Sequence, residues 1–451
     1  MRVGLDWGTT NSSAAIYTAN GVELLPLDPE QPNPGVLRSA LFIGRDGQAS
    51  LGRPAIDRYT EGNVGREIVY ERIFLGTERM TFADIGTVDQ ALFADVDANA
   101  PGRLFLSLKM ALPDRSFLGT DVFGTRWTLE ELIGLMLRGI HDRTEALLGE
   151  PVTEWVIGRP VHYADPAGDE LAIERMHVAA ALAGLPPIRF IPEPVAAALH
   201  YALQASKATR VLVFDFGGGT LDLTVMETTP DGAGRVLATE GVAVGGDLLD
   251  RRIVMGKLLP HFGAGATLGP RGLPLPAFLL DHLDGWQSIV ELHKPKALEV
   301  IDQAIMMGDR KPQLQALRAL VRENYGLPLY EMVERQKRVL SEQPHVMLGM
   351  HAAEIQFDER LERWDFERMI GPDVRAVDAC IERVLVAAGV QAAAIDVVVR
   401  TGGSSRIPRF VRLLVERFGA AKLHDMDAFT SVASGLGIAA AQGIGVENGY
   451  T

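Results

Sequence analysis

Two similar stretches of the sequence each place an aspartate between an apolar run and a small, glycine-containing turn. Asp6 does so in VGLDWGTTNS (3–12), and Asp215 does so in VFDFGGGTLD (213–222). Glycine lets backbone N–H groups approach an anion, and threonine hydroxyls add further donors. A carboxylate suits a hydrated Mg²⁺ ion instead. One such turn is typical of many strand ends, but two copies predict paired phosphate loops across a cleft, with Asp6 and Asp215 holding Mg²⁺ through water.

Two further stretches carry polar residues that suit the nucleoside end of a nucleotide. In RTGGSSRIPRF (400–410) a glycine turn opens a helix, so flat backbone and an arginine plane could lie against a base. In EMVERQKRVLS (331–341) an acid and two bases fall on one helical face. The alternative for 400–410 is an ordinary helix start, and the alternative for 331–341 is a ladder of ion pairs on the protein surface. The candidate residues are Gly402, Gly403, Ser404, Arg406, Glu334, Lys337, Arg338 and Ser341.

Hydrophobic periodicity and turn signals predict the elements that must position these loops. A single antiparallel meander is expected over 2–52, followed by a loop-rich stretch over 56–102. Alternating strands and helices over 153–205 indicate an α/β sheet covered by helices. Residues 253–373 are expected to be mostly helical. The remaining expected elements are a helix over 128–149 capped by Thr128 with Glu131 and stopped at Gly149, a strand pair over 210–228, a strand–turn–helix over 394–419, and a helix over 430–443.

Composition excludes several classes of function. The chain has 451 residues and a formal net charge of −14, which gives no electrostatic reason to bind nucleic acid or an anionic membrane. We find no basic leader and no run of ~20 apolar residues, so a cytoplasmic protein without a membrane partner is expected. The single cysteine, Cys380, has apolar neighbours at helical spacing and is expected in the core.

Taken together, these motifs resemble the nucleotide-binding region of the heat-shock protein 70 (DnaK-type) chaperones. The two aspartate stretches resemble the family's phosphate loops, and IPEPVAAALHYAL (191–203) resembles its Glu-Pro helix. VGGDLLDRRIV (244–254) is similar to its Gly-Gly-acid helix start, whereas ERQKRVLS (334–341) and TGGSSRIPRF (401–410) are similar to its adenosine-contacting helix and loop. The resemblance covers nearly the whole chain, more loosely at 56–102 and 255–330.

This resemblance implies an α/β, two-lobed actin/hexokinase-like ATPase fold with nucleotide in the interlobe cleft. The implied divisions are lobe I over 1–206 with an insertion at about 56–102, lobe II over 207–429 with a helical nucleotide-capping subdomain at about 248–373, and a C-terminal helix over 430–451 returning to lobe I.

The resemblance also implies roles for single residues. Lys109, the only lysine before residue 207, falls where the family keeps a catalytic lysine, although an ordinary surface lysine is the alternative. The other implied catalytic residues are Asp6, Glu193, Asp215 and Thr220, and the metal residues are Asp6 and Asp215. The implied ATP/ADP contacts are Gly8, Thr9, Thr10, Asn11, Gly217, Gly218, Gly219, Asp222, Gly245, Gly246, Asp247, Glu334, Lys337, Arg338, Ser341, Gly402, Gly403, Ser404, Arg406 and Asp427.

The expected function is therefore Mg²⁺-dependent ATP binding with slow hydrolysis to ADP and phosphate. We expect a monomeric chaperone or nucleotide-controlled switch, with a client or co-chaperone protein as further partner. Because no further domain follows residue 451, a peptide-binding domain is expected to be absent. The alternatives are a small-molecule kinase of the same superfold and a filament-forming or enzyme-reactivating actin-like ATPase.

Overall fold

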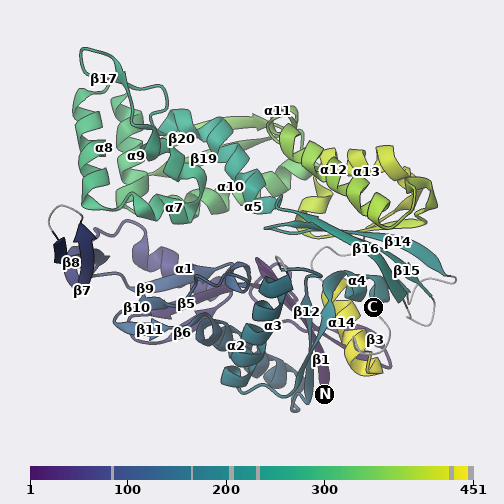
Figure 1. The fold of residues 1–451 in the computed structure, drawn as a ribbon. Coiled ribbons are helices and arrows are strands. Elements are labelled where there is room, and N and C mark those ends of the chain that lie inside the picture. The colour runs from purple at the N-terminus through teal and green to yellow at the C-terminus, as the bar shows by residue number, and fades with distance from the viewer. Residues whose placement is uncertain (83–85, 164–165, 203–207, 230–233, 426–430, 445–451) are drawn as a thin grey trace.

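The computed structural model describes residues 1–82, 86–163, 166–202, 208–229, 234–425 and 431–444, which form two lobes (Figure 1). Each lobe is built around one mixed sheet. The lobe I sheet has the order β13 (Ile188–Pro192), β12 (Glu154–Arg159), β1 (Arg2–Trp7), β2 (Asn11–Thr18), β3 (Gly21–Leu24), with β4 (Leu37–Arg38) also paired to β2. The lobe II sheet has the order β22 (Leu423–Asp425), β21 (Val397–Thr401), β14 (Thr209–Phe216), β15 (Leu221–Thr228), β16 (Gly234–Val242).

The two sheets repeat one topology. In lobe I, β1 pairs antiparallel with β2 and parallel with β12. In lobe II, β14 pairs antiparallel with β15 and parallel with β21. Asp6 lies opposite Ser13, and Asp215 lies opposite Asp222, in each case beside the turn that joins the antiparallel pair. The two aspartates therefore occupy equivalent strand ends, as the similarity of their sequences predicted.

Helices cover both sheets. In lobe I, α2 (Leu129–Leu148) packs on α3 (Pro166–Ala183), and α4 (Glu193–Ala202) packs on α14 (Ser431–Gln442). The last of these helices also lies against β1 and β2, although it is close to the end of the chain (Figure 1). The predicted capping of α2 is confirmed, because Thr128 and Glu131 form a capping box and Gly149 takes φ 69°. In lobe II, α12 (Gly371–Ala387) packs against β15 and β16, and α13 (Pro408–Phe418) packs against α12.

A mostly helical subdomain forms the end of lobe II that lies over lobe I. Its helices enclose an apolar core with the lobe II sheet, and Cys380 is buried there as predicted. The elements are α5 (Gly246–Ile253), α6 (Ala277–Asp281), α7 (Trp286–Glu291), α8 (Pro295–Met307), α9 (Lys311–Arg322), α10 (Gly326–Glu342), α11 (Arg363–Met369), the hairpin β19 (His345–Ala352) and β20 (Ile355–Glu362), and the short pair β17 (Thr267–Leu268) and β18 (Leu273–Pro274). Among the helices that the structure describes, none has the length and apolar character needed to cross a membrane.

Two predictions about the first hundred residues were wrong. The expected single meander divides, because β5 (Ala40–Gly44) and β6 (Ala49–Leu51) join β9 (Gly102–Leu106) in a separate sheet. The stretch 56–102, expected to be loop-rich, contains the end of α1 (Arg53–Asn63) and a long hairpin, β7 (Tyr70–Phe82) with β8 (Gly86–Asp97). This hairpin forms a sheet of its own. Its described neighbours Ile73 and Phe74, which point to opposite faces, are both exposed, so this part of the hairpin has no apolar alternation that would predict a strand.

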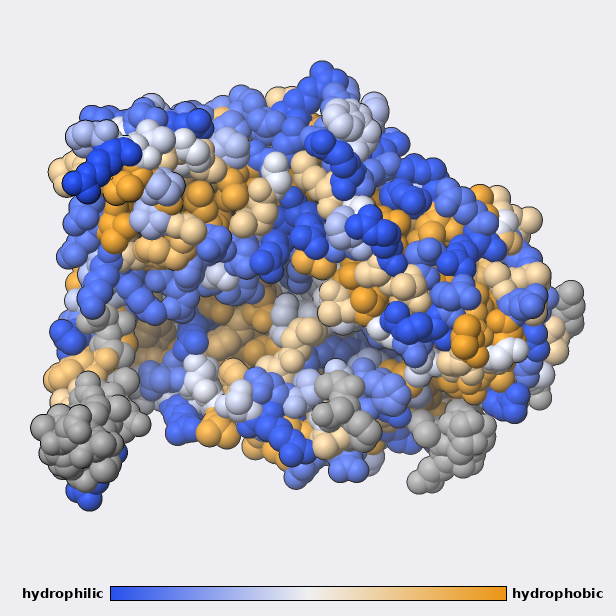
Figure 2. Space-filling view, turned by 45° about the horizontal axis from the view of Figure 1, so that its top comes forward, coloured by the Kyte–Doolittle hydropathy of each residue, from blue (hydrophilic) through white to orange (hydrophobic). Residues whose placement is uncertain are grey.

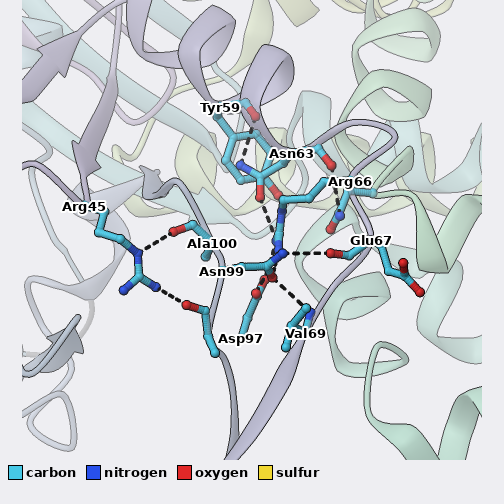
Figure 3. Close-up of polar contacts among 11 residues, drawn as sticks. Arg45, Tyr59, Asn63, Arg66, Glu67, Val69, Asp97, Asn99 and Ala100 are labelled. Atoms are coloured by element: carbon cyan, nitrogen blue, oxygen red, sulfur yellow. Dashed lines mark hydrogen bonds and ion pairs between the residues drawn. The ribbon is translucent and has the colours of Figure 1, made fainter.

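A polar cluster anchors the base of this hairpin and reaches across to lobe II (Figure 3). Arg66 Nη1 donates to Asp97 Oδ1 at 2.9 Å, and Asn99 Nδ2 donates to the carbonyl oxygen of Glu67 at 2.9 Å. Just before this cluster, the Gly65 N–H donates to the carbonyl oxygen of Glu323 at 2.9 Å. Asn324 Nδ2 likewise donates to the carbonyl oxygen of Asn63 at 3.1 Å, so the two lobes are hydrogen-bonded here.

Candidate functional site

A cavity of about 440 Å³ lies between the lobes, where Figure 2 shows the surface hollowed. Its walls come from the β1–β2 and β14–β15 turns, from α5 and α10, and from the turn after β21. Of the predicted residues, Gly245 lies behind the lining and Asp427 lies outside the described residues. The rest line the cavity: Asp6, Gly8, Thr9, Thr10, Asn11, Lys109, Glu193, Asp215, Gly217, Gly218, Gly219, Thr220, Asp222, Gly246, Asp247, Glu334, Lys337, Arg338, Ser341, Gly402, Gly403, Ser404 and Arg406.

The two glycine loops meet at the centre of this cavity. A Cβ atom added to Gly218 would lie 2.2 Å from Thr10 Oγ1, which belongs to the facing loop. One added to Gly245 would lie 2.2 Å from the carbonyl oxygen of Gly218, so Gly245 supports the second loop from behind. Ser39 holds the first loop, since its Oγ donates to the carbonyl oxygen of Gly8 at 2.7 Å. Only glycine permits these approaches, which leave loop N–H groups able to face an anion.

Three part-buried carboxylates lie beside the loops. Burial, with repulsion from Glu193, raises the pKa of Asp6 to about 7, and the same causes raise the pKa of Asp215 well above its ordinary value. Burial also raises the pKa of Asp222 to about 6, although Thr220 Oγ1 donates to its Oδ2 at 2.9 Å. Desolvation disfavours each charged form. Lys109 acts in the opposite direction on all three acids, but it does not outweigh burial.

Lys109 and Glu193 form an ion pair at the same end of the cavity. Lys109 lies in a 3₁₀ turn (Leu108–Ala111), and its Nζ is 2.6 Å from Glu193 Oε1. Burial lowers the pKa of Lys109, but Glu193, Tyr163 and Asp6 outweigh this effect and raise it above the ordinary value. The lysine side chain is only 9% exposed, so it is not an ordinary surface lysine. The contact joins residues far apart in the sequence and holds a charged pair next to the loops.

Comparison with known proteins agrees with this geometry. The family model described as "Hsp70 protein" matches residues 103–263 and 322–449. The chain belongs to the Hsp70 family. It is 28% identical over 444 residues to the chaperone protein dnaK of Cyanidioschyzon merolae, and 27% identical over 440 residues to the chaperone protein DnaK of Thermus thermophilus. These matches cover 97% of this chain and 61% and 60% of the relatives, so the chain spans about three fifths of their length.

The chain is also similar to a plant Hsp70 protein, and the family model leaves parts of the chain unmatched. The chain is 28% identical over 425 residues to the heat shock 70 kDa protein BIP3 of Oryza sativa, a match that covers 92% of the chain and 52% of that relative. The two-lobed architecture is the actin-like ATPase fold of Hsp70 proteins. Residues 1–102, which include the hairpin β7–β8, and residues 264–321 lie outside the stretches that the family model matches.

The helix α10, which carries the Hsp70-like ERQKRVLS stretch, presents Glu334 and Lys337 to the cavity with partners already in place. Arg38 of lobe I donates to both carboxylate oxygens of Glu334, Nη1 to Oε1 at 3.2 Å and Nη2 to Oε2 at 3.1 Å. Burial alone would raise the pKa of Glu334, but Arg38 and Arg338 outweigh it and lower that pKa to about 2. Lys337 Nζ lies 2.7 Å from Asp250 Oδ2 and 2.7 Å from the carbonyl oxygen of Gly246.

Sequence reasoning missed several residues of this Hsp70 site. Asp250 is the partner of Lys337, and its only sequence signal is its position one helical turn after Asp247. Arg38 bonds to Glu334 across 296 positions of sequence, a separation for which no local pattern exists. Thr401 and Ile407 also line the cavity; they lie within the predicted stretch 401–410 but were not singled out there. Val432 lines it without any motif that marks it.

Proposed function

We propose that the interlobe cavity binds ATP and ADP with Mg²⁺, hydrolyses ATP slowly, and transmits the nucleotide state through lobe closure. One observation carries this proposal: a glycine loop from each lobe meets the other at Gly218 and Thr10, and the part-buried Asp6 and Asp215 line the same cavity. Closure on a nucleotide would bring both loops onto the same phosphates. Membership of a family whose ATPase fold this chain shares supports the same conclusion.

The acids beside the loops fit a magnesium ion. Asp6 and Asp215 are oxygen donors with raised pKa values, and a divalent cation would favour their charged forms. Asp6 and Asp215 would hold the ion through its waters from opposite lobes. Bound Mg²⁺ neutralises charge on the phosphates.

The protein's own groups would then position the reactants. The Gly218 and Gly219 amides and the hydroxyls of Thr9 and Thr10 would bind the phosphate oxygens, whereas the Gly217 N–H donates to the carbonyl oxygen of Thr220 at 3.1 Å and closes the loop. Lys109 holds Glu193 in place through their ion pair, so this carboxylate could orient an attacking water. Thr220 and Asp222 would lie beside the terminal phosphate.

The opposite end of the cavity suits the nucleoside. Ser341 and Arg338 on α10 face the turn that carries Gly403, Ser404 and Arg406. Ser404 Oγ donates to the carbonyl oxygen of Gly217 at 3.1 Å, so this turn is tied to the second phosphate loop. A base between the two elements would contact backbone, the plane of Arg406 and the aliphatic part of the lining.

Calorimetric titration with ATP and with ADP, each with and without Mg²⁺, tests the proposal together with steady-state phosphate release. We expect Mg²⁺ to tighten binding, and Asp6→Asn to remove that effect and most of the phosphate release. Asp302→Asn removes an exposed carboxylate of α8 and should change neither. Binding weaker than about 1 mM in every condition would contradict the proposal. The relatives are named as chaperones, and we propose that a client or co-chaperone protein reads the closed state of this chain as well.

A further inference from the structure

A second cavity, of about 340 Å³, adjoins the first between the lobes. Five residues line both cavities: Thr9, Thr10, Asp247, Asp250 and Glu334. The second cavity continues beyond them, toward α1 and α7, and has Arg38 in its wall. Its volume is in the range of small-molecule sites. The chain thus has room for a second ligand beside the proposed nucleotide.

One part of the wall of this second cavity is apolar, and its aromatic residues come from the helical subdomain. Leu106 comes from lobe I, while Trp286, Leu327 and Tyr330 come from the helical subdomain. The Trp286 ring is fixed by an edge contact with Tyr59, with ring centroids 6.1 Å apart. Trp286 lies in the segment 264–321 that the family model does not match, whereas the other three residues lie in matched stretches, so Trp286 is the part of this wall that the family match does not cover.

Asp250 provides an unsatisfied acceptor in the same wall. This residue is only 4% exposed, and Lys337 occupies its Oδ2, whereas Oδ1 has no hydrogen-bond partner among the described residues. Leaving a buried carboxylate oxygen without a donor is costly, so a donor from outside the chain would be stabilised here. Other acids of this wall are already paired, for example Asp284 with Arg251 at 2.8 Å and Glu331 with Arg53 at 3.2 Å.

We propose that this second cavity binds a small organic amine, with its ammonium group on Asp250 Oδ1 and its apolar stem against Trp286 and Leu327. The lining holds more carboxylates than guanidinium groups, namely Asp247, Asp250, Asp284, Glu331 and Glu334 against Arg38 and Arg251, which disfavours anions. An ammonium supplies the missing donor to Oδ1 and a positive charge among these carboxylates, and aromatic faces attract it. An alcohol of the same shape supplies only the donor.

The nucleotide itself is the main alternative occupant of Asp250 Oδ1. Asp250 lines both cavities, so a ribose hydroxyl could donate to the same oxygen. The two assignments differ in one measurable respect. An amine in the second cavity binds together with ATP, whereas an amine that merely fills the ribose position is displaced by ATP.

Titration with benzylamine and butylamine, with benzyl alcohol and butanol as neutral controls of matching shape, tests this inference. Ligand-observed NMR and calorimetry on the whole chain, with and without saturating ATP and Mg²⁺, give the affinities. We expect both amines to bind saturably and at least about tenfold more tightly than the alcohols, with ATP present. Trp286→Ala and Asp250→Asn should each weaken amine binding about tenfold or more, whereas Asp302→Asn should leave it within about twofold.

Several results would overturn the assignment. Equal affinity for amines and alcohols would show that Asp250 supplies no charge recognition, and loss of amine binding with ATP would assign the oxygen to the nucleotide. If neither amine bound the wild-type protein at roughly 10 mM, the proposed site would be excluded. Asp250→Asn could unfold because Lys337 loses its partner. In that case Trp286→Ala alone tests the site, since removing this uncharged side chain leaves no charged partner unpaired.

Discussion

The bridge between Arg38 and Glu334 should slow the release of nucleotide. Arg38 lies in lobe I and Glu334 in α10 of lobe II, so the two hydrogen bonds between them hold the lobes together at the cavity wall. Opening the cleft must break both bonds. Because the contact is bidentate and charge-assisted, it is stronger than a typical exposed ion pair.

The structure sets the size of this effect. The fall of the pKa of Glu334 from 4.5 to about 2 corresponds to about 3 kcal/mol of favourable interaction, of which Arg338 supplies a part. Both side chains of the Arg38–Glu334 bridge are 24% exposed, so water replaces some of that interaction when it opens. A loss of about 1–2 kcal/mol is therefore expected for Arg38→Ala, which corresponds to roughly 5- to 30-fold faster release.

Stopped-flow displacement of a fluorescent ADP analogue measures the release rate directly. Arg38→Ala should release the analogue roughly 5- to 30-fold faster, and Arg38→Lys should fall in between, because lysine keeps the charge but loses the bidentate geometry. Arg53→Ala is the matched control. Arg53 also bonds across to α10, at Glu331, but its side chain is 44% exposed, so release should change by about twofold at most. Unchanged release in Arg38→Ala, or an equal effect of Arg53→Ala, would refute the reasoning.

Three other perturbations test the site itself. Folding raises the pKa of Asp6 from 3.8 to about 7, so the stability it contributes is complete below pH 4 and is lost as the pH rises toward 7; the melting temperature without ligand should fall over this range, and Asp6→Asn should flatten the fall in scanning fluorimetry. Lys109→Met should abolish phosphate release and lower the free energy of unfolding in urea by about 3–5 kcal/mol, because it leaves the carboxylate of Glu193 unpaired. Adding Glu193→Gln should restore the stability but not the activity. Gly218→Ala should weaken ATP binding about tenfold or more in calorimetry, because its Cβ would lie 2.2 Å from a facing hydroxyl; Gly219→Ala, whose nearest neighbour is a methionine sulfur at 3.4 Å, should change it little.

Local sequence patterns correctly predicted the parts of the fold that depend on interactions between residues close in the sequence. The capping box at Thr128 and the glycine turns after Asp6 and Asp215 are short-range features, and the structure has them where the sequence indicates. The hairpin β7–β8 was missed because it forms a two-stranded sheet of its own, and its described apolar side chains Ile73, Phe74 and Phe93 are exposed, so they give no alternation of buried and exposed positions. Contacts between lobes, such as Arg38 with Glu334, depend on how the two sheets are placed, which no local pattern encodes.

The repeated sheet topology makes the proposed ATP hydrolysis depend on the angle between the two lobes. Asp6 and Asp215 occupy equivalent strand ends in two different lobes, so their separation is set by the angle between the lobes. The helices α4 and α14 pack closely on each other, and a Cβ added to Gly435 would lie 1.7 Å from the carbonyl oxygen of Ala196, so this contact resists sliding. Thr401 Oγ1 and Ser431 Oγ, 3.0 Å apart, tie the start of α14 to the lobe II sheet. A relative rotation of the lobes about this region would change the distance between the two acids and the two glycine loops together. Under the proposed function, hydrolysis and closure would be one coupled event, and a partner that senses closure would also sense the state of the nucleotide.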